Sequence, residues 1–184
     1  MAQDLPYGLV RHIPNVLTTL RLLAVPVFAV LMVNADGEQS PAAAVVFAFA
    51  AVTDFLDGEL SRRLHAQTRY GRVLDPIADR LLIDVAVVLL WLDGRVPAVL
   101  VLIVLVRDAI LLFSLLFGRG RSLGIRVNVI GKAGTLVTMI GLLLAMVTER
   151  DALATQIVLW SGVLLLVAGG LIYARTLRRL HGAD

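Results

Sequence analysis

A short acidic stretch sets part of this chain apart from the apolar sequence around it. Residues 54–62 read DFLDGELSR, and Gly71, Asp75 and Asp79 follow. Four aspartates thus fall within 26 residues of a chain that is 59% apolar and 17% charged. Carboxylates are costly in an apolar membrane chain, so those that occur there are candidates for function. The stretch therefore predicts a site, and the rest of the chain must supply the helices that carry it.

The sequence around this stretch predicts a membrane protein built of helices. Repeated apolar runs of about 20 residues match the length that a helix needs to cross a bilayer. We expect an all-α integral membrane protein with a single domain over 1–184, six transmembrane helices and a short interfacial helix in the leader 1–12. The six spans are expected at about 13–32, 41–62, 72–91 (or 74–91), 97–117, 129–147 and 154–174. The chain has no cysteine, which excludes disulfides, thiolate metal sites and a cysteine nucleophile.

The basic residues are divided unequally between the two ends of these helices. When the loops are assigned alternately to the two sides of a membrane, one side receives only Arg95 and Arg150. The other side receives Arg11, the arginines of 62–72, Arg119, Arg121, Arg126, Lys132 and the arginines after 174. By the positive-inside rule, both termini and the acidic stretch lie at the cytoplasmic face. The net charge of +3 then reflects topology, and we expect no nucleic-acid partner.

Helical spacing groups the four aspartates into two pairs. Asp54 and Asp57 are three residues apart, and Asp75 and Asp79 are four apart, so each pair lies on one face of its helix. The two helices are antiparallel and a short loop joins them, so the two faces can meet. The sequence therefore predicts four carboxylates around one point, just inside the membrane.

Four negative charges at low dielectric must be protonated, paired or bound to cations. Arg62 and Arg80 are candidates for pairing, and Arg80 can also pair with Asp84 one helical turn later. Divalent cations are the better account, because oxygen-only ligands suit Mg²⁺, Mn²⁺ or Ca²⁺. Two such ions about 3.5–4 Å apart would share these ligands and polarise phosphoryl oxygens. Gly58 and Gly71 would let a phosphate approach the backbone, and Arg62 offers it a planar fork.

The stretch resembles the signature of the CDP-alcohol phosphotransferases, which are integral membrane enzymes of phospholipid synthesis. The matching pattern is Asp54-x2-Asp57-Gly58-x2-Ser61-Arg62-x8-Gly71-x3-Asp75-x3-Asp79. The family has alanine in place of Ser61, a change between small residues that still allows close approach. The resemblance implies cleavage of a CDP-linked donor, usually CDP-diacylglycerol, transfer of its phosphatidyl group to an alcohol, and release of CMP.

The resemblance also implies a role for each matching residue. The metal ligands, for Mg²⁺ or Mn²⁺ in a two-metal site, match Asp54, Asp57, Asp75 and Asp79. Asp79 also matches the general base that takes the proton of the acceptor hydroxyl. The part of the site that binds CDP matches Gly58, Ser61, Arg62 and Gly71. Enzymes of this family are typically homodimers with the site open to the cytoplasm, which implies a multi-pass protein of the bacterial inner or plasma membrane.

Other positions bear on the acceptor alcohol. The start of the first span, with Asn15, Thr18 and Arg21, and the segment 131–135, with Lys132, resemble the branch of phosphatidylglycerophosphate synthases and cardiolipin synthases. Cationic residues gather on the same side, and the acceptor candidates among them are Arg107, Arg119, Arg126 and Lys132. A phosphate-bearing acceptor suits such a patch. Glycerol 3-phosphate and phosphatidylglycerol both qualify, and inositol phosphate is an alternative acceptor.

These residues also have alternative interpretations. The aspartates could form a structural charge network, or a transit site in a divalent-cation transporter. A transporter places its carboxylates near the bilayer midplane, whereas these lie at the ends of spans beside a phosphate-type arginine, which favours the enzyme. Arg21 could instead extend to the membrane interface. We expect Gly134 and Gly141, and the pair Gly169-Gly170, to serve close helix packing.

Overall fold

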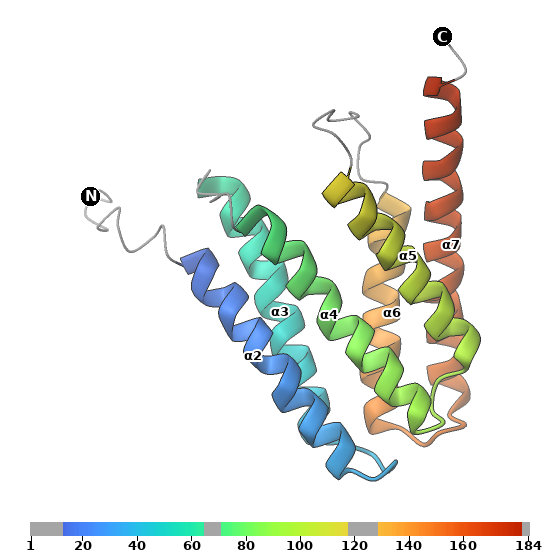
Figure 1. Cartoon of the computed structure of the whole chain (residues 1–184). Coiled ribbons are helices and arrows are strands. Elements are labelled where there is room, and N and C mark those ends of the chain that lie inside the picture. The colour runs from blue at the N-terminus through green and yellow to red at the C-terminus, as the bar shows by residue number, and fades with distance from the viewer. Residues whose placement is uncertain (1–12, 65–70, 118–128, 182–184) are drawn as a thin grey trace.

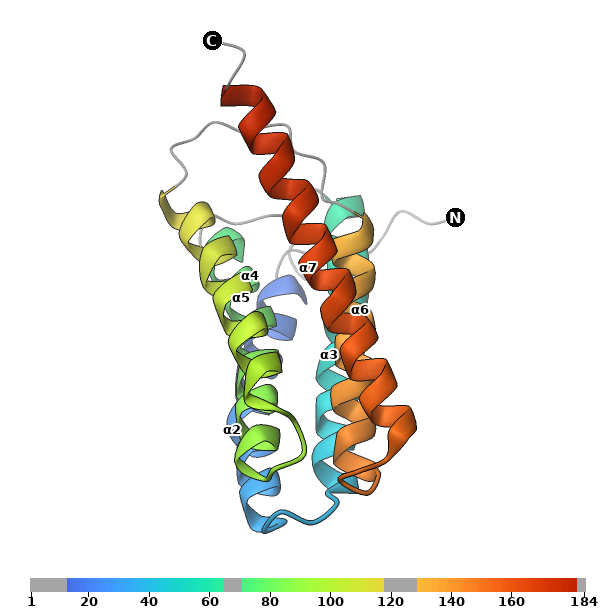
Figure 2. The same cartoon turned by 90° about the vertical axis from the view of Figure 1, so that its right-hand side faces the viewer.

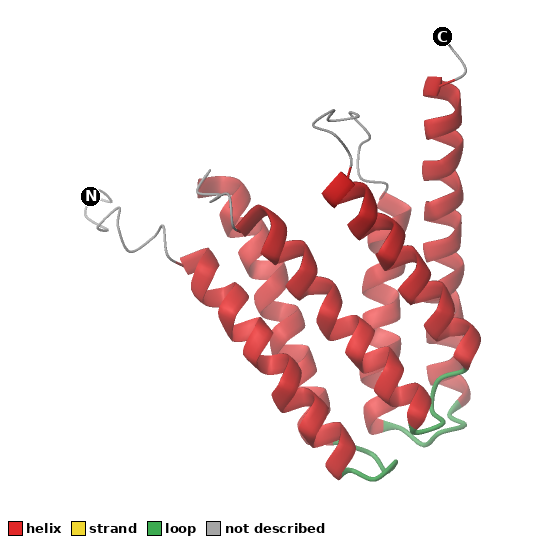
Figure 3. Ribbon diagram, viewed as in Figure 1, coloured by secondary structure: helices red, strands yellow, loops and turns green. Residues whose placement is uncertain are grey.

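The computed structural model describes residues 13–64, 71–117 and 129–181, and within them the side chains of 19–53, 80–113 and 129–172. Six helices make up most of these residues. They are α2 (Ile13–Asn34), α3 (Pro41–Leu64), α4 (Gly71–Leu92), α5 (Ala98–Phe117), α6 (Val129–Val147) and α7 (Leu153–His181). Within these ranges the chain contains only helices and short loops, which confirms the all-α prediction (Figure 3). The predicted leader helix in 1–12 lies outside the described residues.

The helix boundaries agree closely with the predicted spans, with one exception. The first five helices begin and end within about two residues of the expected positions. The last helix, α7, continues to His181 instead of ending near 174. This extension is rich in arginine and leucine, which favour helix, and neither glycine nor proline follows Gly170 until Gly182.

The alternating helix directions give the molecule two ends (Figures 1 and 2). We call the end where α3 finishes and α4 begins the motif end; α2 and α6 also begin there, and α5 and α7 finish there. The opposite, loop end consists of the loops 35–40, 93–97 and 148–152. Both α2 and α6 contact α3 and α4, so the two helices that carry the acidic stretch have two neighbours in common.

The outward surface of the bundle is apolar. Among the described residues, α6 and residues 153–172 of α7 are long and apolar enough to cross a membrane, and shorter apolar helical stretches cover Thr19–Asn34 and Pro41–Thr53. Large apolar side chains face outward on other helices too, such as Val45 on α3 and Leu102 on α5, which are 68% and 63% exposed. Exposed apolar surface of this extent is typical of a face that contacts lipid or another protein.

The helices α6 and α7 pack closely because glycines lie at their contact. A Cβ atom added to Gly134 would lie 2.7 Å from the backbone nitrogen of Leu166, and one added to Gly162 would lie 2.8 Å from the backbone nitrogen of Thr138. Real Cβ atoms essentially never approach another atom within 3.0 Å, so neither glycine can be replaced without moving the helices. The prediction of close packing is confirmed for Gly134, Gly141 and Gly169, and it is wrong for Gly170, where an added Cβ would meet nothing within 4 Å.

We expect Gly162→Ala to lower the free energy of unfolding by about 2–3 kcal/mol, because the new methyl group overlaps the α6 backbone and forces the two helices apart. The matched control is Gly170→Ala on the same helix, where an added Cβ meets nothing within 4 Å. Alanine favours a helix over glycine by up to about 1 kcal/mol, so this control should be neutral or stabilising. Unfolding of both variants in the same detergent tests the contact, and equal stabilities would contradict it.

A glycine turn at the end of α4 directs Arg95 into the protein. Gly94 has φ of 71°, its N–H donates to the carbonyl of Trp91 at 2.9 Å, and the Arg95 N–H donates to the carbonyl of Leu90 at 2.8 Å. These are the two hydrogen bonds of a Schellman motif, in which a left-handed glycine reverses the chain. Arg95 is consequently buried, with 5% of its surface exposed.

The buried Arg95 guanidinium joins the loops of the loop end. It donates to the carbonyl oxygens of Ala145 at 3.0 Å, Thr148 at 2.7 Å and Gly37 at 3.1 Å. Charged donors make stronger hydrogen bonds than neutral ones, and carbonyls left bare in the interior would be costly. These hydrogen bonds explain why Arg95 occurs at the loop end, although the sequence predicts that this end faces away from the cytoplasm, where arginines are few.

Candidate active site

The acidic stretch occupies two helix segments at the motif end. Asp54 and Asp57 lie in the last three turns of α3, and Asp75 and Asp79 lie in the first three turns of α4. Both segments are helical, so each pair has the spacing that puts two residues on one helix face. The side chains of all four aspartates lie outside the described ones, and their convergence stays a prediction.

The remaining signature residues belong to the same segments. Gly58, Ser61 and Arg62 lie near the end of α3, and Gly71 is the first residue of α4. Six residues join the two helices, so the helix ends cannot be more than about 25 Å apart. Together with their common contacts to α2 and α6, this limit holds the two segments in one region of the molecule.

A polar network lies directly beside this region, in the interior of the bundle. Arg80 follows Asp79 in α4, and its Nη1 donates to Asp108 Oδ1 on α5 at 2.5 Å. Arg107 Nη1 donates to the same oxygen at 3.0 Å, and Arg107 Nη2 donates to Thr135 Oγ1 on α6 at 2.8 Å. The Asp108 side chain is 3% exposed, whereas the two arginines are about one quarter exposed. One buried carboxylate therefore connects three helices.

This network was not predicted from the sequence, in which the i, i+4 spacing favoured a pair between Arg80 and Asp84. Among the described side chains, Arg80 forms an ion pair with Asp108, and Asp84 interacts electrostatically with both arginines and with Asp108. The i, i+4 rule compares only positions on one helix, and here the contact between α4 and α5 offers a more deeply buried partner. The adjacent charges Arg107-Asp108 within a 20-residue apolar helix were the signal for such a network.

The acceptor candidates are divided among several elements. Arg21 on α2 is 2% exposed, so the interpretation that it extends to the interface is wrong. Lys132 on α6 is exposed, one turn before Thr135, which is the partner of Arg107. Asn15 and Thr18 lie in the first turns of α2, with side chains outside the described set. Arg119 and Arg126 lie outside the described residues.

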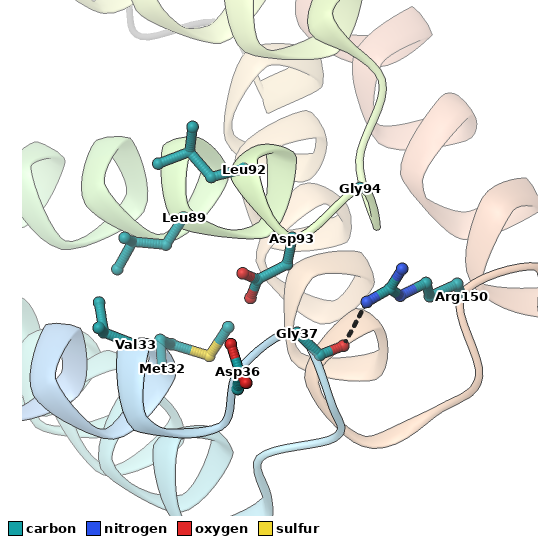
Figure 4. Close-up of a pocket in the computed structure, with 9 residues that line it drawn as sticks. All are labelled: Met32, Val33, Asp36, Gly37, Leu89, Leu92, Asp93, Gly94 and Arg150. Carbon is teal, nitrogen blue, oxygen red and sulfur yellow. Dashed lines mark hydrogen bonds between the residues drawn. The ribbon is translucent and has the colours of Figure 1, made fainter.

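A pocket of about 520 Å³ opens at the loop end, between the ends of α2 and α4 (Figure 4). Asp36 and Asp93 line it, and Arg150 at its edge donates to the carbonyl of Gly37 at 2.9 Å. Burial raises the pKa of the Asp93 carboxyl above its ordinary value, while Arg95 and Arg150 oppose the shift. The pocket is separated from the motif end by the length of α4, about 30 Å, and cannot be part of the same site.

No group of three His, Cys, Asp or Glu side chains lies together among the side chains that the structure describes. The four motif aspartates are not among those side chains. The metal prediction therefore depends on their helix positions and on their chemistry.

Comparison with known proteins gives a consistent family relationship. The sequence profile of the CDP-alcohol phosphatidyltransferases matches residues 11–168. A cardiolipin synthase (CMP-forming) from Streptomyces coelicolor is 35% identical over 94% of this chain and 85% of its own length. A CDP-diacylglycerol--glycerol-3-phosphate 3-phosphatidyltransferase from Rickettsia bellii is 26% identical over 91% of this chain and 96% of its length. A protein of the same name from Pseudomonas fluorescens is 51% identical over a shorter match, 43% of this chain and 40% of that protein.

Proposed function

The chain belongs to the CDP-alcohol phosphatidyltransferase family, and we propose that the polar residues of the motif end carry out its reaction. The protein is an enzyme that transfers the phosphatidyl group of CDP-diacylglycerol to the hydroxyl of a glycerol-type acceptor and releases CMP. The observation that carries the residue assignment is the position of the signature, whose residues all lie in two helix segments at one end of the bundle. The family match also favours the enzyme over a cation transporter.

The donor set at the motif end suits a divalent metal, on which this family generally depends. Asp54, Asp57, Asp75 and Asp79 offer oxygen ligands only, from two helix segments in one region, and such ligands suit Mg²⁺ or Mn²⁺. We assign these four residues to a two-metal site. When bound, the metal ions would neutralise the charge that develops on the diphosphate as CMP leaves.

The other signature residues bind the donor and activate the acceptor. In our proposal Gly58, Ser61, Arg62 and Gly71 bind the CDP part, with the Arg62 guanidinium bonded to phosphate oxygens. Asp79 accepts the proton of the acceptor hydroxyl, whose oxygen attacks the phosphorus of the phosphatidyl group. The bond from that phosphorus to the bridging oxygen breaks, and CMP leaves with the electron pair.

The acceptor in this proposal carries a phosphate. Arg107 supports this assignment, because its two bonds to Asp108 and Thr135 orient a guanidinium that has five N–H donors and is still 26% exposed. Lys132 lies one turn from Thr135 and adds a second cation. The further candidates are Asn15, Thr18, Arg21, Arg119 and Arg126. Glycerol 3-phosphate and phosphatidylglycerol are the two acceptors of this kind that the relatives' names support, and inositol phosphate is the third candidate.

An acceptor screen tests this part of the proposal. Purified protein is given CDP-diacylglycerol, Mg²⁺ and one alcohol at a time: glycerol 3-phosphate, phosphatidylglycerol, inositol phosphate or serine. We expect CMP release with a phosphate-bearing acceptor and none above the no-acceptor rate with serine, and mass spectrometry of the product lipid identifies the acceptor. Turnover with serine alone would contradict the phosphate-bearing acceptor.

We also propose that the six helices span a bacterial inner or plasma membrane, with both termini and the motif end in the cytoplasm. In the same proposal the protein is a homodimer. The unequal distribution of arginines and the apolar outer surface support this topology. Because the chain has no cysteine, single-cysteine variants can report it. We expect an impermeant maleimide to label Glu38→Cys in intact spheroplasts and to leave Asp184→Cys unlabelled until lysis. The opposite labelling would reverse the topology.

A further inference from the structure

Asp108 is the centre of the polar network beside the motif end. Its Oδ1 accepts hydrogen bonds from Arg80 on α4 at 2.5 Å and from Arg107 on α5 at 3.0 Å. Arg107 extends the network to Thr135 on α6, whose own hydroxyl donates to the carbonyl of Gly131 at 3.1 Å. These bonds connect the helix that carries Asp75 and Asp79 to the helices that carry the acceptor candidates Arg107 and Lys132.

Stability alone does not account for this network. Asp108 Oδ2 and Asp84 Oδ1 are buried and receive no hydrogen bond from a cation or a backbone N–H among the described residues, and the two carboxyl groups lie close enough to interact with each other. Buried ion pairs with unsatisfied oxygens are often no more stable than apolar side chains of the same volume. Apolar residues could therefore join α4 to α5 equally well. They could not fix the axial position of one helix against the other as directional charged hydrogen bonds do.

The axial position of α4 is what the proposed chemistry depends on. Arg80 directly follows Asp79, so a guanidinium held by Asp108 fixes the helical turn that carries the base. A general base must lie within about 2.6–3.2 Å of the proton donor, and an error of about 1 Å can lower a rate about 100-fold. A contact that fixes the depth of this turn therefore acts on the rate without touching substrate.

We infer that Asp108 is a positioning residue: by holding Arg80 and Arg107 on one carboxylate oxygen, it aligns the base-bearing turn of α4 with the acceptor-binding face of α5 and α6. This inference rests on the proposed function, in which Asp79 takes the proton and Arg107 contacts the acceptor. The two hydrogen bonds that Asp108 accepts then have separate effects. The bond from Arg80 affects kcat, and the bond from Arg107 affects the KM of the acceptor.

Four variants of the full chain in lipid nanodiscs distinguish the effects of these two hydrogen bonds. Each variant is assayed for CMP release from CDP-diacylglycerol with the acceptor found in the screen. We expect Arg80→Gln to lower kcat at least about 30-fold with the KM of the acceptor within about threefold. Arg107→Gln should mainly raise the KM of the acceptor, and Asp108→Asn should do both. Arg80→Gln combined with Asp108→Asn should lower kcat no further than the more severe single variant, because both remove the same contact.

The controls distinguish positioning from loss of fold. Arg95→Gln removes a buried arginine with three hydrogen bonds at the loop end, so it should lower the unfolding temperature and leave the kcat of the folded protein within about twofold. Arg80→Lys keeps a cation beside Asp108 and should retain more kcat than Arg80→Gln. If Asp108→Asn does not fold, Arg80→Gln becomes the decisive variant.

Two results would overturn the inference. One is a kcat within about twofold of the parent in Asp108→Asn and Arg80→Gln alike, and the other is kcat losses that multiply in the double variant. Failure of the proposed function is distinguishable, because it would appear as normal turnover in Asp79→Asn. An inactive Asp79→Asn combined with a fully active Asp108→Asn would reject the positioning role alone.

Discussion

Replacing Asp79 by asparagine is expected to lower the rate of CMP release at least about 1000-fold, while CDP-diacylglycerol still binds. A carboxylate that acts as general base contributes about 10²–10⁴-fold, and an amide of the same shape cannot accept the proton. The change would also remove one negative ligand from the proposed metal site, which would add to the loss. Turnover is measured as CMP release and donor binding as retention of labelled CDP-diacylglycerol by the purified variant.

Asp93→Asn is the matched control for this experiment. Asp93 lies just beyond the opposite end of α4, in the loop-end pocket, so the same chemical change is made at the other end of the same helix. We expect the rate of Asp93→Asn to stay within about twofold of the parent. If Asp79→Asn turned over at a near-normal rate, another group would have to be the base. If both variants lost activity equally, a general effect on α4 would be indicated.

The sequence predicted the helices well because polar segments, some of them with glycine or proline, separate the apolar runs. The segment 34–40 contains Asn34 and Gly37, 93–97 contains Gly94 and Pro97, and 148–152 separates two long apolar runs. Apolar length between such breaks determines a helix nearly to the residue. The helix α7 continues about seven residues beyond the predicted span 154–174, because the arginines that follow the apolar run also favour helix.

The candidate site was predictable to the extent that it depends on spacing along the chain. The positions of Asp54, Asp57, Asp75 and Asp79 on two helix faces follow from the sequence alone, because α-helical geometry is regular. The partner of Arg80 did not follow, since Asp84 and Asp108 are both carboxylates and only the packing of α4 against α5 selects between them. The burial of Arg21 likewise depends on contacts between helices. Sequence spacing therefore predicts the residues that share a helix face, and tertiary packing decides which charges meet.

Removal of divalent metal is expected to abolish turnover, and Mg²⁺ or Mn²⁺ should restore it. Four aspartates that converge as we propose would repel one another strongly, and the donor diphosphate would add further negative charge. Without cations the donor should bind poorly and the leaving CMP should be left uncompensated, so we expect the rate in excess chelator to fall at least about 1000-fold. CMP release is followed as Mg²⁺ is titrated back against the chelator, with the unfolding temperature measured in parallel to show that the protein stays folded.

The metal concentration that gives half of the maximal rate identifies the ligands. Asp54→Asn removes one charge from the proposed site. Even changes to groups that hydrogen-bond to metal ligands typically weaken metal binding about 10–100-fold. This variant should therefore need at least about tenfold more Mg²⁺. Asp36→Asn is its matched control: it makes the same change at the loop end, at a residue whose φ of 49° asparagine tolerates. An unchanged Mg²⁺ requirement in Asp54→Asn, or full turnover in chelator, would contradict the metal site. A raised requirement in Asp54→Asn alone would connect metal binding to the motif end, because the two variants differ only in which end of the bundle loses a charge.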